Sequence, residues 1–203
     1  NHSSEMDVFM VPGCLPFFSR FSPIFYTSRE QAFYRRAGWR QRFYGGAFFN
    51  IWGAYAVKVG LHDYAKSLAP HELILREGGS LCIFPEGRAT PDGTIQQGKG
   101  GVAYLSYATG RPIVPVRIGG TFGLTPADLF LGRCKLSVSF GEPVWGIAKS
   151  SVVPTAEDFK AQANYVMDRI RALPAPTSPC ETSRSRTLKQ PKYQWKAPIT
   201  PVT

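Results

Sequence analysis

The run HELILREGGSLCIFPEG, residues 71–87, decides the fold, because a helical pattern here gives way to a short apolar strand and then to a loop. The same order recurs downstream, where GVAYLSYATG (101–110) predicts a helix that stops at Gly110 and PIVPVRI (112–118) predicts a strand. A third strand is expected at KLSVSF (135–140). Strands that alternate with helices predict an α/β fold with a mixed, largely parallel sheet flanked by helices.

The end of the chain divides into a helix and a tail. TAEDFKAQANYVMDRIRAL (155–173) predicts an amphipathic, core-facing helix that begins with a capping box of Thr155 and Asp158. Its apolar positions form one stripe: Phe159, Ala163, Val166, Ile170 and Leu173. From 174 to 203 the chain is rich in Pro, Ser, Thr and basic residues without an apolar period. We therefore predict one domain over 1–173 and a disordered basic tail over 174–203.

Positive charge is concentrated near the N-terminus. The chain carries a formal net charge of +10, and between Val8 and His62 a single acidic residue, Glu30, lies among arginines and aromatic residues. This mixture suits an anionic phospholipid surface or a single-stranded nucleic acid, and a solvated basic face over an aromatic core is the structural alternative. No run approaches the ~20 apolar residues of a spanning helix, and no Cys-x-x-Cys pair indicates a zinc site.

The loop after the first predicted strand is a candidate ligand site. In open α/β sheets, ligands bind in loops beyond the carboxyl ends of strands, and Glu86 and Gly87 occupy that position. Gly87 permits close approach of a ligand to the backbone, and Arg88 offers a planar donor suited to phosphate. The alternative is an ordinary turn, since P-x-G and P-D-G are common in loops.

NHSSEMD, residues 1–7, contains a second candidate, the pair His2 and Asp7. Inside one regular helix their side chains would point about 140° apart, so contact requires His2 to lie outside the first turn with Asp7 reaching back. Ser4 to Asp7 has the pattern of a capping box, which predicts a helix start between the two residues. A paired carboxylate would fix the imidazole tautomer and stabilise the imidazolium as His2 takes a proton. Alternatively, Asp7 only caps the helix.

Four ordered blocks together resemble a known family. They are NHSSEMD (1–7), WGAYAVKVG (52–60), SLCIFPEGRATPDG (80–93) and GRPIVPVRIGGT (110–121). The glycerolipid acyltransferases, best known through the 1-acylglycerol-3-phosphate acyltransferases, carry N-H-x-S-x-x-D, G-A-x-P-V-x-R, F-P-E-G-T-R-S and P-I-V-P-V in this order and at similar spacing. The resemblance spans Asn1 to about Pro143, and it implies that further N-terminal elements precede Asn1.

The resemblance implies a reaction. His2 would deprotonate an acceptor hydroxyl while Asp7 orients it, and the oxygen would attack the thioester of acyl-CoA or acyl carrier protein. The acceptor would be a lysophospholipid such as 1-acylglycerol-3-phosphate, in phospholipid biosynthesis or remodelling. No enzyme-bound acyl intermediate, cofactor or metal is required. Glu86 and Gly87 would lie on the acceptor side and Pro115 on the acyl-donor side, although an apolar structural role suits this proline equally well.

The chain departs from the family pattern at two positions. Ala89 occupies the place of the arginine in F-P-E-G-T-R-S, with Arg88 one position earlier, and Val59 occupies the place of the arginine in the second block. A guanidinium can bind a phosphate through two parallel hydrogen bonds, so we predict that Arg88 takes the phosphate role. The ammonium group of Lys58 or of Lys99 would supply auxiliary charge.

The resemblance also implies a location and partners. We expect a membrane-associated protein on a surface with anionic lipids, its active site facing the cytoplasm, and no nucleic-acid partner; the sequence does not indicate an oligomeric state. The alternatives are an acyltransferase for another lipid alcohol and a catalytically inactive lipid-binding relative. A nucleic-acid-binding module rests on charge and aromatic residues alone, and it leaves PEGRATPDG (85–93) unexplained.

Overall fold

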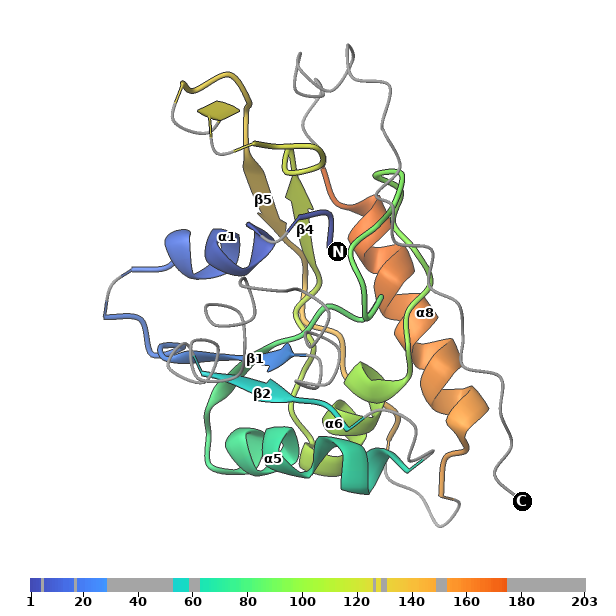
Figure 1. Ribbon diagram of the computed structural model, residues 1–203. Helices are drawn as coiled ribbons and strands as arrows, with labels where there is room; N and C mark the ends of the chain where they lie inside the picture. The colour runs from blue at the N-terminus through green and yellow to red at the C-terminus, as the bar shows by residue number, and fades with distance from the viewer. Residues whose placement is uncertain are drawn as a thin grey trace, which may run out of the picture.

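Figure 1 shows the computed structural model of the protein. The described residues are 1–4, 6–16, 18–28, 53–58, 63–125, 127–128, 131–148 and 153–174. The predicted tail after residue 174 and most of the basic aromatic stretch, residues 29–52, lie outside these ranges. None of the helices in the described part combines the length and the apolar character needed to cross a membrane.

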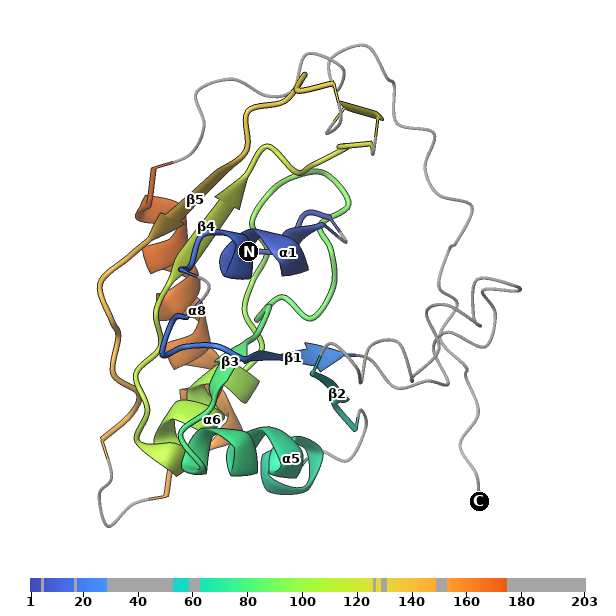
Figure 2. The same ribbon diagram turned by 90° about the vertical axis from the view of Figure 1, so that its left-hand side faces the viewer.

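A parallel sheet of three strands forms one layer of the molecule. Its strands are β1 (Ile24–Ser28), β2 (Ala54–Ala56) and β3 (Ser80–Cys82), in the order β2-β1-β3, and both neighbours of β1 run parallel to it. The apolar strand predicted within residues 71–87 is confirmed as β3, whereas β1 and β2 were not predicted. The sheet lies over helices α5 and α6 in both views (Figures 1 and 2).

A second, antiparallel pair of strands forms a separate sheet, so the predicted α/β fold is confirmed, with its parallel and antiparallel strands in two sheets and not in one. β4 (Val116–Gly119) pairs with β5 (Ser137–Phe140), and an isolated bridge between Ile113 and Val144 continues their direction. β4 begins later than the predicted strand 112–118. Pro115 accounts for this difference, because proline has no N–H to donate to a neighbouring strand.

The helices begin and end where local chemistry allows. α5 (Tyr64–Arg76) starts well before the predicted helical segment because the Asp63 side chain accepts the amide of Lys66 (3.2 Å). α6 (Gly101–Thr109) ends at Gly110, which adopts the left-handed conformation (φ 67°), as predicted. α8 (Ala156–Ala172) begins with the predicted capping box.

The apolar stripe of α8 supplies much of the core, which confirms the predicted core-facing helix. Its buried residues are Phe159, Ala163, Val166, Met167 and Ile170. Val166, Met167 and Ile170 pack against partly buried residues of the loop before α6 and of the β4–β5 layer, namely Ile95, Ile113 and Val144. The β4–β5 pair lies between α8 and the short helix α1 (Asp7–Gly13) in both views (Figures 1 and 2).

Candidate active site

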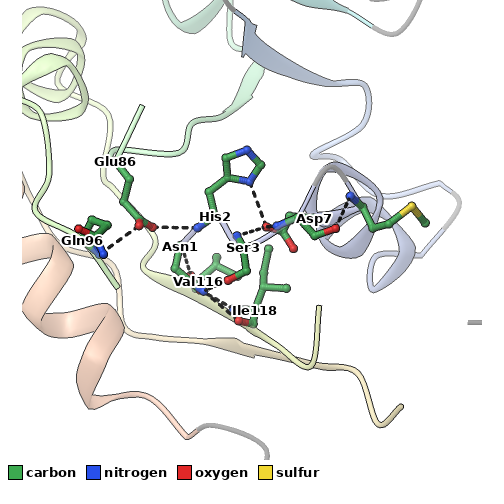
Figure 3. Close-up of polar contacts among 10 residues, drawn as sticks. Asn1, His2, Ser3, Asp7, Glu86, Gln96, Val116 and Ile118 are labelled. Atoms are coloured by element: carbon green, nitrogen blue, oxygen red, sulfur yellow. Dashed lines mark hydrogen bonds and ion pairs between the residues drawn. The ribbon is translucent and has the colours of Figure 1, made fainter. Parts of the chain in front are cut away.

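Asn1 fixes the N-terminal segment to β4. Its side-chain Oδ1 accepts the Ile118 amide at 2.7 Å, and its Nδ2 donates to the Ile118 carbonyl oxygen at 3.0 Å (Figure 3). The carboxamide thus satisfies both backbone groups of one strand residue, as a neighbouring strand would. Sequence reasoning gave Asn1 no role, although it is the first residue of the N-H-x-S-x-x-D block.

The loop after β3 holds both the backbone and the ring of His2. The His2 amide donates to Oε1 of Glu86 at 2.8 Å, and the His2 carbonyl oxygen accepts the Thr90 amide at 2.9 Å. The imidazole stacks on the Phe84 ring, with centroids 4.4 Å apart. The side chain of His2 keeps 19% of its surface exposed, so the ring is both fixed and accessible.

Asp7 is fully buried at the start of α1 and reaches back to His2. Its Oδ2 lies 3.0 Å from His2 Nδ1 and also accepts the amides of Ser3 (2.5 Å) and Ser4 (2.9 Å). The predicted layout, with His2 outside the helix and Asp7 reaching back, is confirmed. The predicted capping box is wrong in one respect, because the Ser4 hydroxyl accepts the Met6 amide (3.2 Å) while the Asp7 amide donates to the Ser4 carbonyl oxygen (3.1 Å).

The contacts of Asp7 determine its charge and the tautomer of His2. Burial alone would raise the pKa of Asp7, but hydrogen bonds, of which that from His2 is the largest, outweigh burial and lower the pKa below its ordinary value. A carboxylate can only accept hydrogen bonds, so Nδ1 of His2 carries the proton in this contact. Nε2 then keeps its lone pair and is the ring nitrogen that can take a proton.

Both oxygens of Glu86 bind backbone amides. Oε1 accepts His2 and Oε2 accepts Gln96 at 3.0 Å, and the side chain is almost fully buried (Figure 3). Glu86 therefore ties the N-terminal segment to the far end of its own loop. These contacts favour a positioning role for Glu86, and its predicted contact with the acceptor stays a prediction.

Gly87 and Lys99 lie against each other beside Glu86. Gly87 has a positive φ of 68°, and a Cβ at this position would lie 2.8 Å from Nζ of Lys99. The Lys99 amide donates to the Pro85 carbonyl oxygen at 2.8 Å, which fixes the backbone from which the side chain extends. The positive φ therefore favours glycine at position 87, and the loop places an ammonium group next to it.

The other predicted site residues differ in their exposure and in their contacts. Arg88 is exposed in the same loop. Lys58 follows β2, and its amide donates to the Ser67 carbonyl oxygen of α5 (3.4 Å). Pro115 is fully buried just before β4, and its carbonyl oxygen accepts the Gly141 amide (2.8 Å). Within the described residues, no three His, Cys, Asp or Glu side chains lie together where they could hold a metal ion.

Comparison with known proteins shows the family to which this chain belongs. The family model described as "Acyltransferase" matches residues 1–119, and the chain belongs to this acyltransferase family. The chain is similar to a probable 1-acyl-sn-glycerol-3-phosphate acyltransferase of Mycoplasma pneumoniae, with 38% identity over 97 residues, which are 48% of this chain and 36% of that protein.

A plant relative and a solved structure extend the comparison. The chloroplastic 1-acyl-sn-glycerol-3-phosphate acyltransferase BAT2 of Brassica napus is 29% identical over 75 residues, or 36% of this chain and 22% of that protein. The matched segments thus span about a third or less of the length of these curated relatives. The crystal structure of the 1-acyl-sn-glycerophosphate acyltransferase PlsC of Thermotoga maritima has the same fold, with a TM-score of 0.50, 20% identity, and coverage of 85% of this chain and 64% of that one.

The two backbone contacts of Glu86 generate a stability prediction. In Glu86→Gln, one side-chain oxygen can still accept an amide, but the new NH₂ group faces the other amide and leaves it unpaired. A buried unpaired group costs about 1–3 kcal/mol, so the free energy of unfolding should fall by that amount in urea denaturation. The exposed Glu142→Gln is the matched control and should change it little. Equal stability of Glu86→Gln and the parent would contradict the observed contacts.

The lowered pKa of Asp7 generates a pH prediction. A carboxyl group whose pKa is lower in the folded state stabilises the fold above its unfolded pKa of about 3.9, and this contribution is lost as pH falls through the folded pKa. Asp7→Asn removes the contribution, so its unfolding free energy should depend less steeply on pH in the acid range. Asp63, Asp92 and Asp158 also have lowered pKa values, through hydrogen bonds, and retain part of the slope. Thermal unfolding between about pH 5 and pH 2.5 measures the difference, and an unchanged slope would contradict it.

Proposed function

We propose that this protein transfers a fatty acyl group from an acyl thioester to the hydroxyl of a lysophospholipid. The observation that carries the proposal is the contact of His2 Nδ1 with the buried Asp7 carboxylate, which leaves Nε2 as the proton acceptor. Membership in the acyltransferase family supports it, and the relatives named above are 1-acyl-sn-glycerol-3-phosphate acyltransferases.

In the proposed reaction, Nε2 of His2 takes the proton of the acceptor hydroxyl as the oxygen attacks the thioester carbonyl carbon. The new C–O bond forms, the C–S bond breaks, and the thiolate leaves with the electron pair of that bond. The imidazolium then returns its proton to the thiolate. The Asp7 carboxylate stabilises the transient imidazolium and keeps the ring oriented, as the aspartate does in other Asp–His pairs.

The loop after β3 is the proposed site for the acceptor phosphate. Lys99 presents its ammonium group across Gly87, whose neighbour Glu86 binds the backbone of His2. A phosphate bound there would lie close to the proposed base, and Arg88 from the same loop would add a second cation. We propose that Lys99 contributes more to phosphate binding than Arg88 does, because the Lys99 amide bonds the Pro85 carbonyl oxygen and the Lys99 side chain lies over the loop.

We further propose that the protein works at the cytoplasmic surface of a membrane, within phospholipid biosynthesis, with acyl-CoA or acyl carrier protein as donor. Two exposed aromatic side chains, Phe18 and Phe21, follow α1, and the guanidinium of Arg20 lies 5.1 Å from the Phe21 ring centroid. Aromatic and basic side chains together suit the interface of an anionic bilayer.

One observation favours a second candidate function. Ala89 stands where the family pattern has its phosphate-binding arginine. An acceptor without a phosphomonoester, such as another lipid alcohol, would not need that group. A panel of acceptors with and without a free phosphate, incubated with labelled acyl-CoA and the intact protein in membranes, separates the two functions.

His2→Ala tests the proposed base. Loss of a positioned general base lowers the rate by about 10²- to 10⁴-fold, and transfer of labelled acyl groups should fall by this factor. His71→Gln is the control, because His71 is buried in α5 and bonds the Tyr55 carbonyl oxygen (3.1 Å) instead of lining this site. Transfer within threefold of the parent by a folded His2→Ala variant, judged by circular dichroism, would refute the assignment.

Lys99→Ala tests the phosphate site. A hydrogen bond to a charged group is worth about 1.5–3 kcal/mol, so kcat/KM for lysophosphatidate should fall roughly 10- to 150-fold, and Arg88→Ala should have a smaller effect. Transfer to monoacylglycerol, which lacks the phosphate, should change little in either variant. Lys160→Ala, an exposed cation on α8, is the matched control. Equal losses with both acceptors would argue against phosphate binding by Lys99.

A further inference from the structure

Thr121 is a fully buried polar residue that the proposed reaction leaves without a role. One residue, Gly120, separates Thr121 from the end of β4, and the side chain of Thr121 has no exposed surface. Among the described residues, its hydroxyl oxygen has no hydrogen-bond partner within ordinary geometry. Buried hydroxyl groups in folded proteins are nearly always paired, so the position calls for an explanation.

The Asp7 carboxylate has one oxygen that lacks a hydrogen-bond donor within the described ranges. Its Oδ2 accepts the His2 ring and two backbone amides, whereas its Oδ1 is equally buried and lacks a donor within ordinary geometry in the described part of the chain. The Thr121 side chain lies beside this carboxyl, and its proximity contributes to the lowered pKa of Asp7. A hydroxyl can donate and a carboxylate oxygen can only accept, so the two groups match.

The backbone next to Thr121 is tightly constrained. Gly120 has a positive φ of 84°, and a Cβ there would collide with the carbonyl oxygen of Lys135, so the turn after β4 requires glycine. Ile118, three residues before Thr121, is the residue that binds the Asn1 side chain. The end of β4 therefore lies next to the N-terminal segment at two places. Ile118 pairs with Asn1, and Thr121 lies beside Asp7.

We propose that Thr121 is a positioning residue, whose hydroxyl donates to Oδ1 of Asp7 and holds the carboxylate plane so that Oδ2 stays on Nδ1 of His2. With donors on both oxygens, rotation of the carboxylate would break hydrogen bonds on each side. The catalytic consequence rests on the proposed acyl transfer, whereas the hydrogen bond itself does not.

Three variants test the catalytic consequence. Thr121→Val keeps the shape of the side chain and removes the hydroxyl, and it should lower kcat about 10- to 100-fold with KM for the acceptor within twofold. Thr121→Ser restores the donor and should stay within threefold of the parent. Ser137→Ala removes another buried hydroxyl without a partner among the described residues, on β5, and should leave kcat unchanged. An unchanged kcat in a folded Thr121→Val variant overturns the positioning role.

A carboxyl titration followed by ¹³C NMR tests the hydrogen bond without reference to activity. In Thr121→Val the ionised form of Asp7 loses a donor, so the pKa of Asp7 should rise, and in Thr121→Ser it should stay near the parent value. An unchanged pKa in Thr121→Val overturns the proposed bond. If the intact parent transfers no acyl group to any acceptor, the proposed function fails, and this titration still decides the bond.

The parent protein provides a measurement that needs no variant. If Thr121→Val does not fold, the Thr121 hydroxyl proton of the parent decides the question. A hydroxyl proton protected from exchange with solvent, and close to the Asp7 side chain by nuclear Overhauser effect, supports the bond. A protected proton that lies close to another acceptor instead overturns the proposal.

Discussion

The pairing of the Asn1 carboxamide with both backbone groups of Ile118 is the interaction on which the arrangement of the site depends. It joins residues that are 117 positions apart in the chain. The proposed base lies one residue after Asn1, so the strand β4 determines where the imidazole can be. β4 thus fixes the position of the backbone at His2. The Asp7 carboxylate and the loop after β3 then fix the orientation of the His2 ring.

The elements that sequence could predict are those determined by neighbours in the chain. The capping box of Thr155 and Asp158, the stripe of α8 and the glycine at the end of α6 are all local signals, and all three are confirmed. β1 and β2 were not predicted because their part of the chain was interpreted by its charge and aromatic content, although Ile24–Ser28 is rich in β-branched and aromatic residues. The start of β4 shifted because Pro115 cannot donate to a ladder.

The candidate site divides in the same way. The spacing of His2 and Asp7 within NHSSEMD was sufficient to predict that they could touch, since both lie in one short segment. Gln96 and Thr121 could not be found, because the amide that binds Glu86 and the hydroxyl that we propose to donate to Asp7 gain their roles only through tertiary contacts. Lys99 was predicted on charge alone, and the fold explains its place through Gly87.

Glu86 binds the N–H groups of His2 and Gln96, not their side chains. Every amino acid except proline carries such a group, so substitution at position 96 can alter the loop surface without loosening the hold on the base. The side chain of Gln96 contacts only neighbours within its own loop among the described residues, Asp92 and Thr94. Substitutions at position 96 can therefore change the surface where we propose that the acceptor binds, while the backbone contacts that hold His2 are inherited unchanged.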